Sequence, residues 1–288
     1  MNTKELLKKV RKIEIKTRKL SNNIFGGEYH SAFKGRGMTF SEVRKYQYGD
    51  DVRTIDWNVT ARYREPYVKV FEEERELTLM LLVDISGSSN FGTRTKLKNE
   101  ILTEIAATLA FSALNNNDKV GLVLFSNKIE LFIAPKKGKI HILRIIRELL
   151  NHESTSLKTN ISKALEFLSQ VQKKKAIIFV LSDFIDSNYS KSVQLLSKKH
   201  DLTGVRIFDL FEKELQKSGL LFVNDAETGR KLWINSSSKK VRESYNLSYR
   251  KNADYFKKTF SKNGAGAIAL STNDEYVKTL LNYFKNRA

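Results

Sequence analysis

The chain lacks cysteine altogether and has only 2 prolines among its 288 residues. The absence of cysteine excludes disulfides, thiol nucleophiles and cysteine-ligated zinc, and it is typical of proteins in a reducing compartment. Long hydrophobic runs are missing as well, because the longest apolar runs, Leu77–Val83 and Ala176–Leu181, are far too short to span a bilayer. We therefore expect a protein of the cytoplasm.

Positive charge is in surplus: 51 Lys and Arg against 32 Asp and Glu give a formal net charge of +19. A nucleic-acid-binding protein concentrates such charge on one element or face. Residues 1–76 carry 17 basic and 12 acidic side chains, residues 77–215 carry 20 and 14, and residues 216–288 carry 14 and 6. Because the surplus is spread over the whole chain, nucleic acid is the less favoured class of partner.

Residues 1–20 form the one local concentration, with eight basic and two acidic side chains. Their apolar positions follow helical spacing and predict a basic amphipathic helix: Leu6, Val10, Ile13, Thr17 and Leu20. Such a helix either packs its apolar stripe on its own domain or lies on an anionic membrane surface. We favour the first alternative, because amphipathic helices of soluble proteins mostly bury their stripe internally.

The remaining chain divides at about residue 77. Residues 22–76 are rich in glycine, charge and aromatics without helical periodicity, which predicts an N-terminal appendage (1–76) of loops and short strands. From Leu77 to the end, apolar runs alternate with amphipathic stretches. This alternation predicts a doubly wound α/β domain (77–288), with a mostly parallel sheet and helices on both faces. Strands are expected at 77–84, 119–125, 128–134, 176–183, 204–210, 219–223, 231–234 and 265–270, and helices at 97–109, 140–150, 161–168 and 276–284.

Oxygen-bearing side chains cluster where the first buried strand ends. Asp84, Ser86 and Ser88 occupy alternate positions there, so a turn can aim all three at one point. Asp183 ends a second buried strand, and Thr159 precedes a predicted helix on the same edge of the sheet. Since Mg²⁺ takes oxygen ligands in octahedral geometry, we predict that these five residues hold one Mg²⁺ ion and leave a position open.

With this Asp-x-Ser-x-Ser pattern, a later threonine and a later aspartate, the segment from Leu77 onward resembles a von Willebrand factor A domain with its metal-ion-dependent adhesion site. The resemblance implies a Rossmann-like sheet. It also implies a bound Mg²⁺ or Mn²⁺ whose open position accepts an Asp or Glu carboxylate from a partner protein.

The likeness extends over nearly the whole chain to the bacterial family called domain of unknown function 58. The motifs that carry it are Gly35-x-Gly37-x-x-Phe40, Glu42-x-Arg44-x-Tyr46, Gly49-Asp50-Asp51-x-Arg53-x-Ile55-Asp56-Trp57, Ala61-Arg62, Glu74-Arg75-Glu76 and Asp225-x-Glu227-Thr228-Gly229. Members are generally associated with MoxR-type AAA+ ATPases, so the resemblance implies an adaptor or co-chaperone. One departure is Ser156-Leu157-Lys158, which stands where a glycine-rich lead-in often precedes the threonine.

The stretch Gly49–Arg62 combines acids, arginines and a tryptophan without an activated nucleophile. We interpret five of its side chains as an ion-pair network that seats the N-terminal region on the main domain: Asp50, Arg53, Asp56, Trp57 and Arg62. Docking of a partner is the alternative, since Arg and Trp are favoured at interface hot spots.

Catalysis and nucleotide binding lack a sequence signature. The four histidines show no metal-binding spacing, and neither a Walker nor a GxGxxG loop is present, so we expect no zinc hydrolysis and no nucleotide bound by this chain. A metal-dependent hydrolase would need a general base, for which Asp186 is a weak candidate. The predicted function is therefore a metal-dependent protein interaction without enzymatic activity, with nucleic-acid or membrane-surface binding as the alternative.

Overall fold

The computed structural model describes residues 38–73, 77–92, 97–225 and 229–287. The described chain falls into two units, one within residues 38–77 and the other within residues 78–287. The amphipathic helix predicted for residues 1–20 lies outside the described residues.

The small unit is a two-stranded antiparallel sheet with a helical connection. Strand β1 (Met38–Lys45) pairs with β2 (Tyr67–Glu73), and between them lie the single-turn helix η2 (Val52–Thr54) and α3 (Trp57–Tyr63). Helix α3 begins where it does because the Asp56 carboxylate accepts hydrogen bonds from two backbone N–H groups of its first turn. Short strands and loops are thus found as predicted, whereas α3 was not expected.

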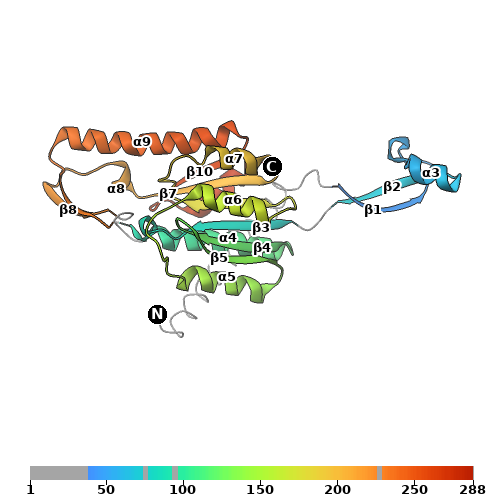
Figure 1. The fold of residues 1–288 in the computed structure, drawn as a ribbon, viewed down its shortest axis with the longest axis horizontal. Helices are drawn as coiled ribbons and strands as arrows, with labels where there is room; N and C mark the ends of the chain where they lie inside the picture. Colours follow the sequence, from blue (N-terminus) through green and yellow to red (C-terminus); the bar gives the residue numbers. More distant parts are fainter. Residues whose placement is uncertain (1–37, 74–76, 93–96, 226–228, 288) are drawn as a thin grey trace. The chain divides into compact units, whose positions relative to one another are not determined.

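The main unit is built on a six-stranded sheet in the order β10-β7-β6-β3-β4-β5 (Figure 1). Every pairing is parallel except that of the edge strand β5 with β4, which is antiparallel. Counted from the first strand of the unit, the order is 3-2-1-4-5-6, a doubly wound arrangement. The strands are β3 (Thr78–Asp84), β4 (Lys119–Phe125), β5 (Ile129–Lys136), β6 (Ile177–Ser182), β7 (Asp201–Phe208) and β10 (Gly266–Ser271).

Helices cover both faces of this sheet. One buried cluster joins residues of β3, β4 and β6 to residues of three helices: α6 (Ile161–Val171), α7 (Ser190–Ser197) and α9 (Lys239–Lys262). Successive side chains of a strand point to opposite faces, and the other face meets a different set: α4 (Lys98–Asn115), α5 (Lys139–Asn151) and α10 (Tyr276–Lys285). Phe179 of β6, for example, packs edge-on against Phe284 of α10. The predicted α/β fold with helices on both faces is confirmed.

Three further elements lie in the second half of the chain. The strands predicted near residues 219–234 form a separate antiparallel pair, β8 (Leu220–Asn224) and β9 (Lys231–Asn235), and a short helix, α8 (Leu210–Lys213), precedes them.

Helices α7 and α9 were not predicted. The 24-residue α9 buries only Phe256, Thr259 and Phe260, so its sequence carries little apolar periodicity. No described helix is long and apolar enough to cross a membrane.

Candidate functional site

Strands β3 and β6 are neighbours in the sheet although three α-helices and two other strands separate them in sequence. The chain leaves them in opposite directions along the sheet, so their carboxyl ends form a topological switch point, where ligands of doubly wound folds bind. Asp84 is the last residue of β3, and Asp183 directly follows β6. The two carboxylates line one pocket with Ser88, Ser89, Lys98, Leu102 and Ile207.

Asp84 is fixed by hydrogen bonds to both carboxylate oxygens. Its Oδ1 accepts the backbone N–H of Ser86 at 2.9 Å, and its Oδ2 accepts the Ser182 hydroxyl at 2.6 Å. Only 2% of the residue is exposed. Burial, together with the negative charge of Asp183, raises the pKa of Asp84 to about 6. An additional cation at this carboxylate would therefore be stabilising.

The two predicted serines lie on the turn that follows β3. The Ser86 and Ser88 hydroxyl oxygens are 3.2 Å apart, so one donates to the other. The turn continues as the single-turn helix η3 (Gly87–Asn90), in which the Ser89 hydroxyl donates to the Ser86 carbonyl at 2.7 Å. Of the two predicted serines, Ser88 lines the pocket, whereas Ser86 is fully buried and is not among the lining residues.

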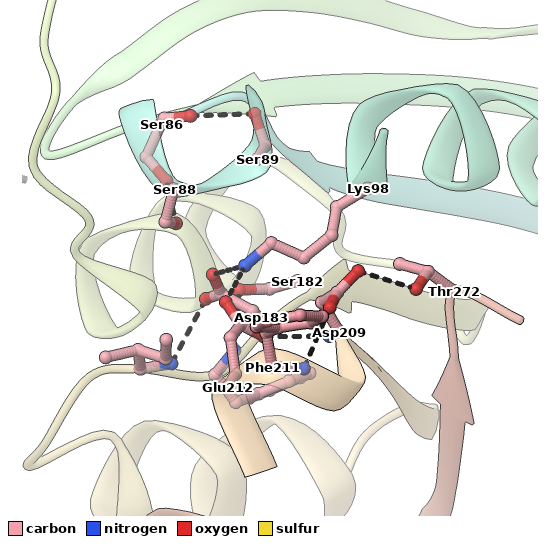
Figure 2. Close-up of polar contacts among 12 residues, drawn as sticks. Ser86, Ser88, Ser89, Lys98, Ser182, Asp183, Asp209, Phe211, Glu212 and Thr272 are labelled. Atoms are coloured by element: carbon pink, nitrogen blue, oxygen red, sulfur yellow. Dashed lines mark hydrogen bonds and ion pairs between the residues drawn. The ribbon is translucent and has the colours of Figure 1, made fainter. Parts of the chain in front are cut away.

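Asp183 belongs to a buried ion-pair cluster that the sequence did not predict (Figure 2). The Lys98 ammonium lies 2.8 Å from Asp183 Oδ2 and 2.6 Å from Glu212 Oε1, and Lys98 is 1% exposed. Burial acts to raise the pKa of Asp183, but the Lys98 ammonium outweighs it and holds that pKa below its usual value. Burial likewise opposes the charge of Lys98, yet Asp183 and Glu212 together raise its pKa.

Thr159 lies on the same edge of the sheet but does not line the pocket. Its loop is held by two backbone hydrogen bonds, from Gly87 N–H to the Leu157 carbonyl at 3.0 Å and from Asn160 N–H to the Ser126 carbonyl at 2.9 Å. The Thr159 hydroxyl is buried without a hydrogen-bond partner, an uncommon state for a buried polar atom. Asn160, and not Thr159, caps α6, which begins at residue 161.

The donor chemistry of this cluster fits a hard divalent cation. Two carboxylates and the Ser88 hydroxyl line the pocket, and the Ser86 hydroxyl lies 3.2 Å from that of Ser88. The unpartnered Thr159 hydroxyl belongs to the loop whose Leu157 carbonyl accepts the Gly87 N–H. Charge points the same way, because the residues that line the pocket include two acidic side chains, Asp84 and Asp183, and one basic side chain, Lys98. Among the described residues no three His, Cys, Asp or Glu side chains are grouped to hold a metal, so hydroxyls would have to supply part of any shell.

Asp186, the weak candidate for a general base, is used by the backbone. Its carboxylate accepts the N–H groups of Ile161 at 2.8 Å and Ser187 at 2.6 Å. It is not among the residues that line the Asp84 pocket. These contacts tie the start of α6 to the loop after β6.

The described partners of the Gly49–Arg62 stretch lie within the small unit. Arg44 makes a two-pronged ion pair with Asp50 at 2.7 and 2.8 Å, and Lys69 lies 3.6 Å from Asp56. Trp57 is 68% exposed. The interpretation that this stretch seats the N-terminal region on the main domain concerns the relation of the two units and stays a prediction.

Comparison with known proteins gives a family profile and several relatives. The profile described as "Protein of unknown function DUF58" matches residues 42–255. Uncharacterised proteins of Mycobacterium tuberculosis and Mycobacterium bovis are 23% identical over 283 residues, which is 96% of this chain and 88% of theirs. The uncharacterised protein YeaD of Bacillus subtilis is 29% identical over 109 residues, covering 38% of this chain and 25% of that protein.

Solved structures resemble the chain only distantly. The conserved hypothetical protein BatB from Bacteroides thetaiotaomicron matches with a TM-score of 0.48 and 12% identity, over 73% of this chain and 98% of its own. The SpRpn10 VWA domain matches with a TM-score of 0.38 and 11% identity, over 74% of this chain and 95% of its own. The fold described above therefore rests on strand order and helix placement in the chain itself.

Proposed function

The chain belongs to the DUF58 family of proteins of unknown function, and we propose that it is a protein-interaction module whose binding depends on Mg²⁺ or Mn²⁺. The observation that carries the proposal is the placement of Asp84 and Asp183 at the switch point of the sheet, beside serine hydroxyls and with an excess of buried negative charge.

In this proposal each residue has a defined task. The ligands would be Asp84, Ser86, Ser88, Thr159 and Asp183. Hydrogen bonds from Ser86 N–H and the Ser182 hydroxyl orient the Asp84 carboxylate before any ion arrives. The ion, when bound, supplies positive charge at an open position, to which an Asp or Glu carboxylate of a partner protein binds. The chain needs no catalytic group for this task, and we propose no enzymatic activity.

A MoxR-type AAA+ ATPase is the partner that we propose, on the strength of the resemblance given above. The chain would then act as an adaptor or co-chaperone of that ATPase. Its net charge of +19 would speed association with an acidic partner surface. Asp84 and Asp183 would define the point at which the partner carboxylate docks.

Affinity between the purified chain and a MoxR-type ATPase of the same genome tests this proposal. We expect binding in Mg²⁺, loss of binding in EDTA and recovery when Mg²⁺ is added in excess. Asp84→Asn should bind at least about tenfold more weakly, since it removes one charge at the ion. Asp254→Asn, which removes an exposed carboxylate of α9, is the matched control and should bind like the wild type.

Two outcomes would contradict the proposal. Binding that persists in EDTA and is unchanged in Asp84→Asn would show that the interaction uses another surface. Binding of nucleic acid that survives EDTA and falls steeply with salt would instead support the alternative of a basic nucleic-acid-binding protein.

A further inference from the structure

The proposed metal site already contains a positive charge. Lys98, at the first turn of α4, is 1% exposed, and its Nζ contacts Asp183 Oδ2 at 2.8 Å and Glu212 Oε1 at 2.6 Å. Figure 2 shows dashed lines from the ammonium to both carboxylates. Because Asp183 is one of the proposed ligands, the Lys98 ammonium and an incoming ion would compete for its carboxylate.

Glu212, the second acceptor, is held in place without help from Lys98. It lies in the first turn of α8, where its Oε2 accepts the N–H of Asp209 at 2.9 Å in a capping box. Asp209 in turn accepts the Thr272 hydroxyl at 2.9 Å and the N–H of Phe211 at 2.9 Å. This network holds the Glu212 carboxylate in place, so it can remain paired with the Lys98 ammonium when Asp183 binds the ion.

Charges in a buried site interact strongly, because little water screens them. A divalent ion on Asp183 and an ammonium on the same carboxylate repel each other, and the free energy of that repulsion lowers affinity for the ion. Moving the ammonium wholly onto Glu212 relieves part of the repulsion while keeping the buried lysine paired, and an unpaired buried charge would be costly.

We propose that Lys98 is a resident competitor of the metal ion, and that Glu212 is the acceptor that retains it when the ion binds. Lys98 neutralises Asp183 in the metal-free chain, so the fold does not depend on an ion. In the metal-bound chain Lys98 pairs with Glu212 alone. This inference rests on the proposed metal site and adds the pair of residues that sets its affinity.

A double-mutant cycle on the full chain, measured by calorimetric titration with Mg²⁺ and with Mn²⁺, tests it. Lys98→Met removes the competitor and should bind the ion at least about tenfold more tightly than the wild type. Glu212→Gln removes the alternative acceptor and should bind it more weakly. Lys278→Met, which removes an exposed lysine of α10, is the matched control and should leave the affinity unchanged.

The double variant Lys98→Met/Glu212→Gln shows whether Glu212 affects the affinity for the ion through Lys98 or only through its own negative charge. If Glu212 acts through Lys98, the loss seen in Glu212→Gln disappears once Lys98 is gone, and the double variant binds like Lys98→Met within about twofold. The double variant also removes one charge of each sign, so it keeps the test alive if Lys98→Met alone fails to fold. Its circular dichroism and melting temperature report folding independently.

Stability gives a second measurement. Lys98→Met leaves its buried carboxylates without a counter-charge, so in EDTA it should melt below the wild type, and Mg²⁺ should raise its melting temperature by more than that of the wild type. Equal shifts in the two proteins would overturn the proposal.

The outcomes also separate this inference from the proposed function. A wild type that binds the ion, with Lys98→Met no tighter, overturns the inference and leaves the metal site standing. Equal losses from Glu212→Gln in both backgrounds overturn it too. A wild type that binds no ion, together with binding in Lys98→Met or in the double variant, supports the inference. No binding in any of the proteins overturns the metal site and the inference together.

Discussion

Asp84 and Asp183 are both buried at the same edge of the sheet, yet their surroundings differ in charge. Asp183 is paired with the Lys98 ammonium, which keeps its pKa low. The hydrogen bonds of Asp84 come from a serine hydroxyl and a backbone N–H, and burial raises its pKa to about 6. Asp84 is therefore the carboxylate of the site that gains most from an added cation.

The sequence indicated one half of this site. Asp84 and Asp183 could be placed because buried parallel strands are easy to recognise and their carboxyl ends share one edge. Lys98 and Glu212 could not be placed in this way. In the local sequence, a buried lysine or glutamate at the start of a helix looks the same as an exposed one. Their burial depends on how α4 and α8 approach the strand ends, which is a property of the assembled fold.

His200 gives the fold a pH dependence. The residue follows α7, is 4% exposed, and neither ring nitrogen has a hydrogen-bond partner in the structure. Burial lowers its pKa below the usual value, so the unfolded chain binds a proton more readily than the folded chain does. The contribution of His200 to stability is therefore complete above about pH 6.5 and is lost as the pH falls below it.

Urea unfolding of the wild type and of His200→Leu, at about pH 7.5 and about pH 5.5, measures this contribution. We expect the unfolding free energy of the wild type to fall more than that of His200→Leu when the pH is lowered. Only the wild type has this imidazole, which binds a proton more readily in the unfolded chain than in the folded chain. The other three histidines are present in both proteins and cancel in the comparison. Equal losses would mean that His200 does not titrate differently in the folded state.

At the scale of elements, strands were more predictable than helices. All eight predicted strands of the main unit are present. Strands such as β3 and β6 are easy to recognise because apolar residues fill almost their whole length. Helix α9 escaped prediction since it touches the core through only a few side chains near its C-terminal end. Helix α7 has only 8 residues, too few for a clear periodicity. Tertiary contact, rather than local pattern, positions both.

Gly204 allows α9 to approach the sheet. A Cβ added at this position of β7 would lie 2.7 Å from ring atoms of both Phe256 and Phe260 of α9. These rings pack on each other and on Phe184, so they have little freedom to move aside. The absence of a side chain at Gly204 is therefore a packing requirement of the α9–sheet contact.

Gly204→Ala should lower the unfolding free energy by about 1–3 kcal/mol, the usual cost of overpacking a core. Gly121→Ala in β4 is a matched comparison, because the Cβ there would chiefly meet the flexible thioether of Met80, at 2.5 Å from its sulfur. Urea unfolding should show the larger loss for Gly204→Ala. An equal or smaller loss would mean that α9 can shift on the sheet at little cost.

For the whole molecule, the net charge of +19 and the local acidic cluster have different roles. The basic residues are distributed along the sequence, so they bias association with acidic partners without defining where contact occurs. The buried carboxylates at the ends of β3 and β6 define a single point, and at that point the charge balance is negative. The proposed function depends on this contrast between a positive chain and a negative pocket.

The claim that this pocket holds a divalent ion is tested most directly by calorimetric titration of the full chain with Mg²⁺ and Mn²⁺. We predict one ion per chain, with Asp84→Asn binding at least about tenfold more weakly and Asp254→Asn binding like the wild type. Binding that is unchanged in Asp84→Asn would contradict the claim. A wild type and a Lys98→Met variant that both bind neither ion would contradict it as well. If Lys98→Met binds an ion and the wild type does not, Lys98 excludes the ion from the wild-type site.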